Sequence, residues 1–190
     1  MSRIFIESKE FQKVDFSKEL LLKGDYEQCR FVDCVFTNSK LVDSSFLDCV
    51  FENCDLSLAT IANTAFRDVT FKGCKMLGLQ FDGCNQFGLS IQFQGCQLNL
   101  SSFYKLRLRN TKFNNCTLHE VDFTDADLTG VAFTNCDLLG AKFENTILEK
   151  TDFRTAHNYS FDPEINRVRK AKFSFSGIPG LLDKYQIDIE

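Results

Sequence analysis

Thiols are the most reactive side chains in this sequence, which has nine cysteines among its 190 residues. They are Cys29, Cys34, Cys49, Cys54, Cys74, Cys84, Cys96, Cys116 and Cys136. Zinc requires thiolates that converge tetrahedrally, usually from closely spaced pairs, and Cys29–Cys34 and Cys49–Cys54 come near that spacing. All nine, however, share one repeated position. The chain is built from five-residue units, described below, and each cysteine lies two residues before the centre of a unit. A free cysteine at such a position serves as a small buried hydrophobe. We therefore expect reduced, metal-free thiols. Their odd number and burial favour a reducing, cytoplasmic location.

Two other patterns resemble chemical sites but lack essential partners. The segment "DFTDADLTG", with Asp122, Asp125 and Asp127, resembles a calcium loop but has neither alternate-residue ligands nor a closing glutamate. His119 and His157 are the only histidines, and the His119-Glu120 pair is not followed by the second histidine of a zinc-protease helix. We expect both histidines at the surface, so a catalytic dyad is not predicted.

The basic residues and the glycines also give no catalytic signal. Lys105, Arg107, Arg109 and Lys112 form a basic cluster that is more typical of a solvated patch than of a phosphate site, and no glycine-rich phosphate loop is present. The sequence therefore predicts a protein that is not an enzyme, with no cofactor and no small-molecule substrate.

The element that positions all these residues is a repeat of period five. In "NTKFNNCTLHEVDFTDADLTGVAFTNCDLLGAKFENTILEKTDF", which runs from Asn110 to Phe153, every fifth residue from Phe113 onward is Phe or Leu. On an α-helix this spacing would spread the apolar groups around the axis, and on a strand it would alternate between faces. The apolar groups keep one orientation only if the chain bends once per unit, so that four units close a square coil of twenty residues.

The repeat runs through most of the chain in two registers, Phe11 to Phe81 and Phe93 to Phe153. Residues twenty apart should then stack at the strand spacing of ~4.8 Å and fill the interior with their own side chains. The core ladders expected from this rule include Phe31, Phe51, Phe71, Phe113, Phe123, Phe133 and Phe143.

The two registers are separated by a break at residues 84–92. Phe81 and Phe93 are twelve residues apart, two more than two units require, and Gly88 is the natural place for an unusual backbone conformation. The break is either a register slip with no role or a feature of functional significance.

Units such as "CDLSL", "ADLTG" and "CDLLG" resemble the repeat of the pentapeptide-repeat family, over roughly residues 11–155. The resemblance implies an all-β solenoid, a right-handed quadrilateral β-helix of about seven coils. We assign residues 1–157 to this β-helix, and residues 158–190 to a loop, a last partial coil and a C-terminal helix and strand.

The C-terminal segment should cover the open end of the solenoid, because a last coil exposes unpaired strand edges and core. Pro179 suits the first turn of a short helix that carries Leu181, Leu182 and Tyr185, and Ile187 and Ile189 alternate as in a strand. In the quinolone-resistance (Qnr-like) subgroup, which the sequence resembles, a similar helix and strand join two rods. This resemblance implies an end-to-end homodimer through Leu181, Leu182, Tyr185, Ile187 and Ile189.

Charge is consistent with a protein partner rather than with nucleic acid or membrane. The net charge is −4, and no apolar run approaches the ~20 residues that span a bilayer. Residues 113–149 hold seven carboxylates against Lys142 alone. The Qnr-like resemblance implies a DNA mimic that binds DNA gyrase or topoisomerase IV and protects it from quinolones. The alternative is a generic interaction scaffold with no topoisomerase role. The expected partner-binding acids are Glu120, Asp122, Asp125, Asp127, Asp137 and Glu144.

Overall fold

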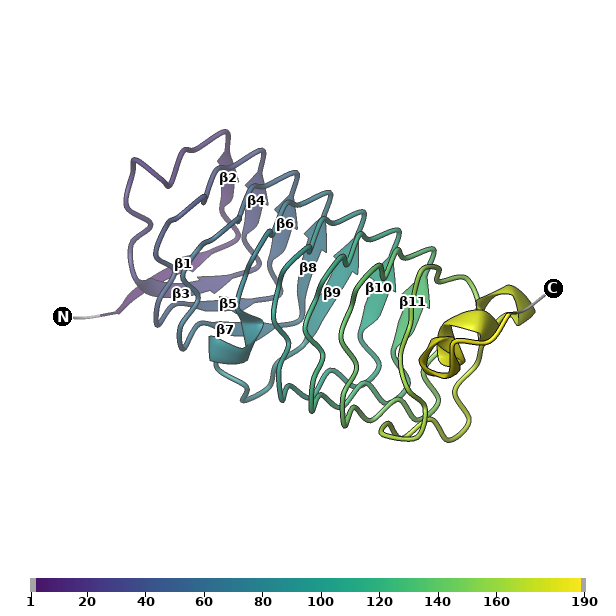
Figure 1. The fold of residues 1–190 in the computed structure, drawn as a ribbon. Helices are drawn as coiled ribbons and strands as arrows, with labels where there is room; N and C mark the ends of the chain where they lie inside the picture. The colour runs from purple at the N-terminus through teal and green to yellow at the C-terminus, as the bar shows by residue number, and fades with distance from the viewer. Residues whose placement is uncertain (1–2, 189–190) are drawn as a thin grey trace.

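The computed structural model describes residues 3–188 as a rod of square coils stacked along one axis (Figure 1). The chain forms a parallel β-solenoid of about 7 turns, with the N-terminal coil at one end and short helices at the other. The predicted fold class is confirmed. None of the helices in residues 3–188 combines the length and apolarity needed to span a bilayer.

Two sides of the square carry regular strands. One sheet has the order β1-β3-β5-β7 and the other β11-β10-β9-β8-β6-β4-β2, with every pairing parallel. The strands are β1 (Ile4–Glu7), β2 (Glu10–Gln12), β3 (Gly24–Glu27), β4 (Arg30–Val32), β5 (Ser45–Leu47), β6 (Val50–Glu52), β7 (Ala65–Arg67), β8 (Val69–Lys72), β9 (Ile91–Gln94), β10 (Lys112–Asn114) and β11 (Ala132–Thr134). The other two sides are joined by isolated bridges such as Asp55↔Lys75 and Asp122↔Lys142.

The sharp corners explain the residues that follow each central side chain. Two positions after the centre the backbone repeatedly adopts a positive φ, as at Asn53 (53°), Gly73 (60°) and Asn115 (53°). Asn, Asp and Gly tolerate this left-handed conformation best, so their abundance at these positions is a consequence of the turn.

The interior is a set of stacked side-chain columns. Phe31 and Phe51 stack with ring centroids 4.6 Å apart, and Phe113 and Phe133 with centroids 5.1 Å apart. All seven phenylalanines expected in the core have relative exposures of 2% or less. The expected ladders are confirmed, and the coils leave their interior filled by their own side chains.

The break at residues 84–92 does not interrupt the main phenylalanine column. The pairing Phe71↔Phe93 spans 22 residues instead of 20, and the two rings still stack at 5.5 Å. The short 3-10 helix η1 (Phe81–Gly83) precedes the extra residues, and Gly88 has the predicted unusual backbone, with φ of 69°. The two registers predict one phenylalanine column before the break, ending at Phe71, and another after it, starting at Phe93. In the structure these two columns are continuous.

The C-terminal end differs from prediction in two ways. The helical segments are the 3-10 helices η2 (Phe175–Leu181) and η3 (Asp183–Tyr185), so Pro179 lies inside η2 and not in its first turn. Gln186, in the left-handed region at φ 50°, ends η3, and Ile187 follows as exposed irregular chain instead of a strand. Ile189 lies outside the described residues. The expectation of a terminal strand is therefore wrong at Ile187.

Glycine lets η2 pack closely on the last coil. The amide of Phe161 donates a 3.1 Å hydrogen bond to the carbonyl of Gly180, and a Cβ at Gly180 would overlap the carbonyl oxygen of Tyr159. The inward side of this segment is partly apolar, since Phe173 stacks on Phe153 at 5.4 Å and Leu181 packs against the core. The segment thus covers the end of the rod as expected of a cap.

Candidate interaction surfaces

Four of the six expected partner-binding acids lie together on one side of the rod. Glu120, Asp122 and Asp125 lie on the side of one coil whose inward-pointing residue is Phe123. Glu144 lies on the same side of the next coil. The two coils are adjacent, because the amide of Asp125 donates a 2.9 Å hydrogen bond to the carbonyl of Glu144. We call Glu120, Asp122, Asp125 and Glu144 the acidic face.

The acidic face is only moderately charged. Lys105 precedes Asp125 by twenty residues, so it occupies the equivalent corner of the previous coil. Lys142 lies in the next coil, where it forms a β-bridge with Asp122. None of the four carboxylates is ion-paired within the part of the chain that is described. The face is therefore a surface of unpaired carboxylates that is flanked by lysines.

Asp127 does not belong to this surface, although its neighbours in sequence do. It is 7% exposed, and Arg109 donates from Nε to its Oδ2 at 2.7 Å while Thr129 donates to its Oδ1. Burial alone would raise the pKa of Asp127, but the hydrogen bonds from Thr129 and Arg109 outweigh it and hold the pKa below its usual value. Asp127 therefore stabilises the coil and is not available to a partner, which corrects the expectation that it faces solvent.

Asp137 is also occupied. Its Oδ2 lies 2.9 Å from His119 Nε2, and its Oδ1 accepts a 2.8 Å hydrogen bond from Asn158. Burial opposes ionisation of Asp137, but His119 and Asn158 together keep its pKa below the usual value. It lies on the side of the rod whose inward residue is Leu138, one side before the acidic face.

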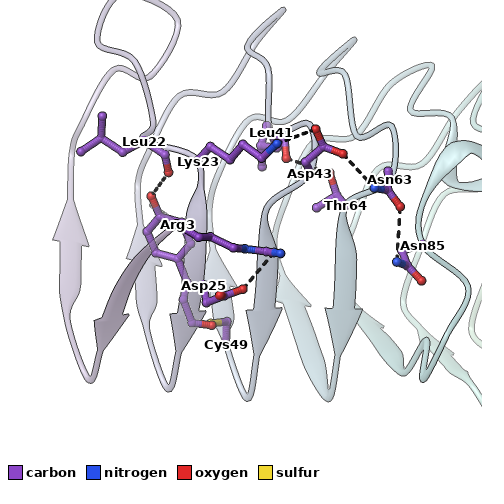
Figure 2. Close-up of polar contacts among 11 residues, drawn as sticks. Arg3, Leu22, Lys23, Asp25, Leu41, Asp43, Cys49, Asn63, Thr64 and Asn85 are labelled. Atoms are coloured by element: carbon purple, nitrogen blue, oxygen red, sulfur yellow. Dashed lines mark hydrogen bonds and ion pairs between the residues drawn. The ribbon is translucent and has the colours of Figure 1, made fainter. Parts of the chain in front are cut away.

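A polar depression of about 260 Å³ marks the N-terminal half of the rod. Figure 2 shows that its side chains bind one another: Lys23 Nζ contacts Asp43 at 2.7 Å, and Asn63 donates to the same carboxylate at 2.8 Å. The hydrogen bond from Lys23, followed by that from Asn63, lowers the pKa of Asp43. Asn85 extends the row by donating to Asn63 at 3.3 Å. This row connects successive coils, and its two charged groups, Lys23 and Asp43, are paired with each other.

An apolar corner lies on the middle coils. Leu58, Leu77 and Leu100 are 60%, 37% and 55% exposed, and Leu58 and Leu100 occupy equivalent corner positions on either side of Gly78. A Cβ at Gly78 would contact Leu58 Cδ2, so the Leu58 side chain lies over the glycine.

A second exposed apolar group lies on a different side of the rod, at the break. Phe87 is 80% exposed there, and the Arg67 guanidinium lies 5.7 Å from its ring centroid.

A basic corner near the C-terminal end was not anticipated from the sequence. Lys150 and Lys170 occupy the same corner of consecutive coils, with φ of 60° and 61°, and the amide of Lys150 donates to the carbonyl of Arg169 at 3.0 Å. These three cations and Glu149 border a depression of about 270 Å³. The signal that could have revealed the corner is the twenty-residue spacing of the two lysines.

The residues expected at the dimer interface lie near the C-terminal end but differ in exposure. Leu181 and Leu182 are half-buried, whereas Tyr185 and Ile187 are 52% and 55% exposed. Phe175, which the sequence did not single out for the interface, is 95% exposed at the start of η2. The cap therefore leaves apolar side chains uncovered.

The nine cysteines are free and buried, as predicted. Each thiol whose hydrogen bonds are described donates to a backbone carbonyl, as Cys54 does to Phe31 at 3.2 Å. Burial raises the pKa of the Cys49 and Cys84 thiols to about 12, so they are neutral at physiological pH. Among residues 3–188, no group of three or more Cys, His, Asp or Glu side chains is placed so that it could hold a metal ion.

Comparison with known proteins agrees with this architecture. Residues 24–92, 44–123 and 89–157 match the family described as "Pentapeptide repeat region". No curated protein matches the sequence significantly. Among solved structures, a trypsin-treated variant of QnrB1, a plasmid-mediated fluoroquinolone resistance protein, is similar over 98% of this chain and 92% of its own, at 21% identity and a TM-score of 0.55. HetL of Nostoc sp. strain PCC 7120, a pentapeptide repeat protein involved in heterocyst differentiation regulation, is similar over 92% of this chain and 86% of its own, at 15% identity and a TM-score of 0.53.

Proposed function

The chain belongs to the pentapeptide-repeat family, and on that premise we propose that it is a non-enzymatic rod that binds a type II DNA topoisomerase in place of DNA. The acidic face is the observation that carries the proposal. Four carboxylates without ion pairs lie on one side of two adjacent coils, where they are accessible to a basic groove. Carboxylates held on a rigid rod attract the cations that otherwise contact DNA phosphates.

The structural likeness to QnrB1 supports the rod architecture on which this proposal depends. QnrB1 is a fluoroquinolone resistance protein, and the similarity extends over nearly the whole of both chains. At 21% identity the likeness concerns the fold, so the topoisomerase remains our proposal and depends on the acidic face.

We propose further that two chains associate through their C-terminal ends. Phe175, Tyr185 and Ile187 leave apolar area exposed around the cap, beside the half-buried Leu181 and Leu182. A second copy would remove this area from water, and two rods in line would double the length available to a DNA groove.

The test is a supercoiling assay with purified DNA gyrase, with and without a fluoroquinolone. We expect the protein at micromolar concentration to inhibit supercoiling or to protect it from the drug. The triple variant Asp122→Asn, Asp125→Asn and Glu144→Gln should weaken the effect, most strongly at low salt, where screening is least.

A matched control removes the same charge elsewhere. Glu19→Gln, Asp33→Asn and Asp48→Asn alter three exposed carboxylates on other sides or coils and should leave the effect unchanged. If wild-type protein neither inhibits nor protects gyrase, the topoisomerase proposal is wrong.

A protein-interaction scaffold is the second candidate, favoured by the apolar corner of Leu58, Leu77 and Leu100. Exposed apolar clusters of this kind are typical of protein-binding surfaces. A scaffold of this type should lose its partner in the double variant Leu58→Ser, Leu100→Ser, while the acidic-face variant should retain it. The reverse result would favour the topoisomerase proposal.

A further inference from the structure

One side of the rod in its C-terminal half carries mostly cations. It holds three arginines and lysines for every carboxylate, six cations against two acids, which is a local balance of +4 in a chain of net charge −4. We call it the basic side, and it consists of residues 107–110 (RLRN), 127–130 (DLTG), 147–150 (ILEK) and 167–170 (RVRK).

Backbone pairing holds these four segments in register on consecutive coils. One column of β-bridges runs from Arg107 through Asp127 and Ile147 to Arg167. Cations that are sixty residues apart in the sequence therefore lie on one rigid surface, roughly 14 Å long at the coil spacing of ~4.8 Å. The basic cluster of Arg107 and Arg109, which the sequence predicts to be a solvated patch, is thus one end of a longer surface.

Both carboxylates of the basic side are already neutralised within it. Arg109 Nε donates to Asp127 at 2.7 Å, and Arg167 Nη2 donates to Glu149 at 2.6 Å. The two arginine side chains are still 65% and 66% exposed, so each guanidinium keeps further N–H donors at the surface. The other four cations are exposed and form no ion pair among residues 3–188: Arg107, Lys150, Arg169 and Lys170.

The chemistry and the length of the basic side suit a row of phosphates. Four of its six cations are arginines, whose planar guanidinium binds a phosphate through two parallel hydrogen bonds. Successive phosphates of one DNA strand are spaced ~3.4 Å apart along the helix axis, so a surface of roughly 14 Å matches about four of them.

The basic side offers nothing that would bind unpaired bases. None of its four segments, all of which the structure describes, contains an aromatic side chain on which a base could stack. Contacts confined to phosphates fix the position of a duplex but do not read its sequence. The surface therefore fits the outside of a duplex rather than a single strand.

We propose that the basic side binds the phosphate backbone of duplex DNA without sequence preference. The acidic face lies on the preceding side of the rod, because Phe123 and Leu128 are consecutive inward residues. The two surfaces share no residue, so DNA binding at the basic side does not depend on a topoisomerase partner. The net charge conceals the basic side, since the excess of carboxylates lies on other sides.

Fluorescence anisotropy with a labelled duplex tests the proposal. We expect the wild-type protein to bind a duplex of about 20 base pairs with micromolar affinity at ~50 mM salt, and to bind a duplex of scrambled sequence equally well. About four phosphate contacts predict that the affinity falls roughly 100-fold when the salt is raised from ~50 to ~200 mM.

The critical variant removes the four unpaired cations through Arg107→Gln, Lys150→Asn, Arg169→Gln and Lys170→Asn. Asparagine replaces the two lysines because both have positive φ, which asparagine tolerates well. The affinity at ~50 mM salt should fall by at least about tenfold, and its dependence on salt should weaken. If circular dichroism shows that this variant does not fold, Lys150→Asn with Lys170→Asn should fold and still lower the affinity by about threefold.

A matched control removes four positive charges from other sides of the rod, through Lys13→Asn, Lys40→Gln, Lys72→Gln and Lys75→Gln. These lysines are exposed and form no ion pair among the described residues, so control and critical variant have the same net charge. The control should bind the duplex within about twofold of wild type, and equal losses in the two variants would show that binding follows net charge and would overturn the proposal.

Two further outcomes decide between the possible partners. The acidic-face variant of Asp122, Asp125 and Glu144 should bind the duplex at least as tightly as wild type, which separates this proposal from the topoisomerase proposal. Polyglutamate that displaces the labelled duplex as effectively as unlabelled duplex, at equal concentration of charge, would show that the basic side accepts acidic polypeptides and would overturn the proposal. An absence of duplex binding at ~50 mM salt would equally overturn it.

Discussion

Truncation of one ring in a second phenylalanine column, the stack of Phe103, Phe123 and Phe143, tests the fold most directly. Phe123 is fully buried, with Phe103 and Phe143 stacked at 5.3 Å on either side and Phe133 edge-on at 5.8 Å. Truncation of a buried Phe to Ala costs ~3–5 kcal/mol, and the cost is greatest where the cavity cannot collapse.

Collapse is restricted here by the backbone. The amide of Phe123 donates to the carbonyl of Lys142 at 3.0 Å, and that of Phe103 donates to Asp122 at 2.8 Å, so the coil spacing is fixed above and below the cavity. We therefore expect Phe123→Ala to lie in the upper half of the range, about 4–5 kcal/mol. For a chain of this length that is a loss of about 8–20 °C in melting temperature, at ~2–4 °C per kcal/mol.

Phe87→Ala is the matched control, because it makes the same chemical change at the break. Phe87 is 80% exposed, so its truncation should change the free energy of unfolding by no more than ~0.5 kcal/mol. Both variants should be compared with wild type by equilibrium urea unfolding, with coincident circular dichroism and fluorescence transitions as the check on two-state behaviour. Equal losses at the two positions, or a loss below ~1 kcal/mol at Phe123, would refute the assignment of the column.

Three other predictions follow from the structure. Thiol titration in denaturant should find nine free groups per chain, and a lower titre would indicate a disulfide. Asp127→Asn should lower the free energy of unfolding at pH 7 by ~1–2 kcal/mol, because hydrogen bonds to a charged group are lost, while Asp122→Asn should have little effect. Because the folded pKa of Asp127 is depressed, its contribution is fully present above the unfolded pKa of ~3.9 and is lost as pH falls through the folded pKa; a difference that stays constant throughout an acid titration of the folded protein would contradict this. Leu181→Asp with Leu182→Asp should give monomers by light scattering with the coil intact, and a variant that remains dimeric would show that the segment is only a cap.

The fold could be predicted from the sequence because few backbones place an apolar group inward every fifth residue. The phenylalanine columns followed from spacing alone, and so did the inward position of cysteines such as Cys116 and Cys136. The continuity of the column through Phe71 and Phe93 was not predicted, because two extra residues can either shift the stack or leave it as a bulge. The structure adopts the bulge, which projects Phe87 and keeps the rings in contact.

The C-terminal segment was predicted less well because its local signals are short. Alternation at Ile187 and Ile189 spans only three residues, too few to define a strand without a partner. Gly177, Pro179 and Gly180 disfavour a regular α-helix, so the chain packs as 3-10 turns over Tyr159 instead.

The surface could be predicted only in part, because in a solenoid the neighbours of a residue lie about twenty positions away. Asp122, Asp125 and Asp127 look equivalent along the chain, yet Arg109, eighteen residues earlier, pairs with Asp127 alone. The inward columns determine the coil more strongly than the outward side chains do, so an outward column can vary wherever its residues neither form a corner nor bind the neighbouring coil. Two proteins with the same inward columns are therefore expected to form the same rod, but not to bind the same partner. Lys150 above Lys170, and Asp137 between His119 and His157, are properties of this chain's own columns. Its function must be sought in those columns, where a change of one side chain alters a surface that spans several coils.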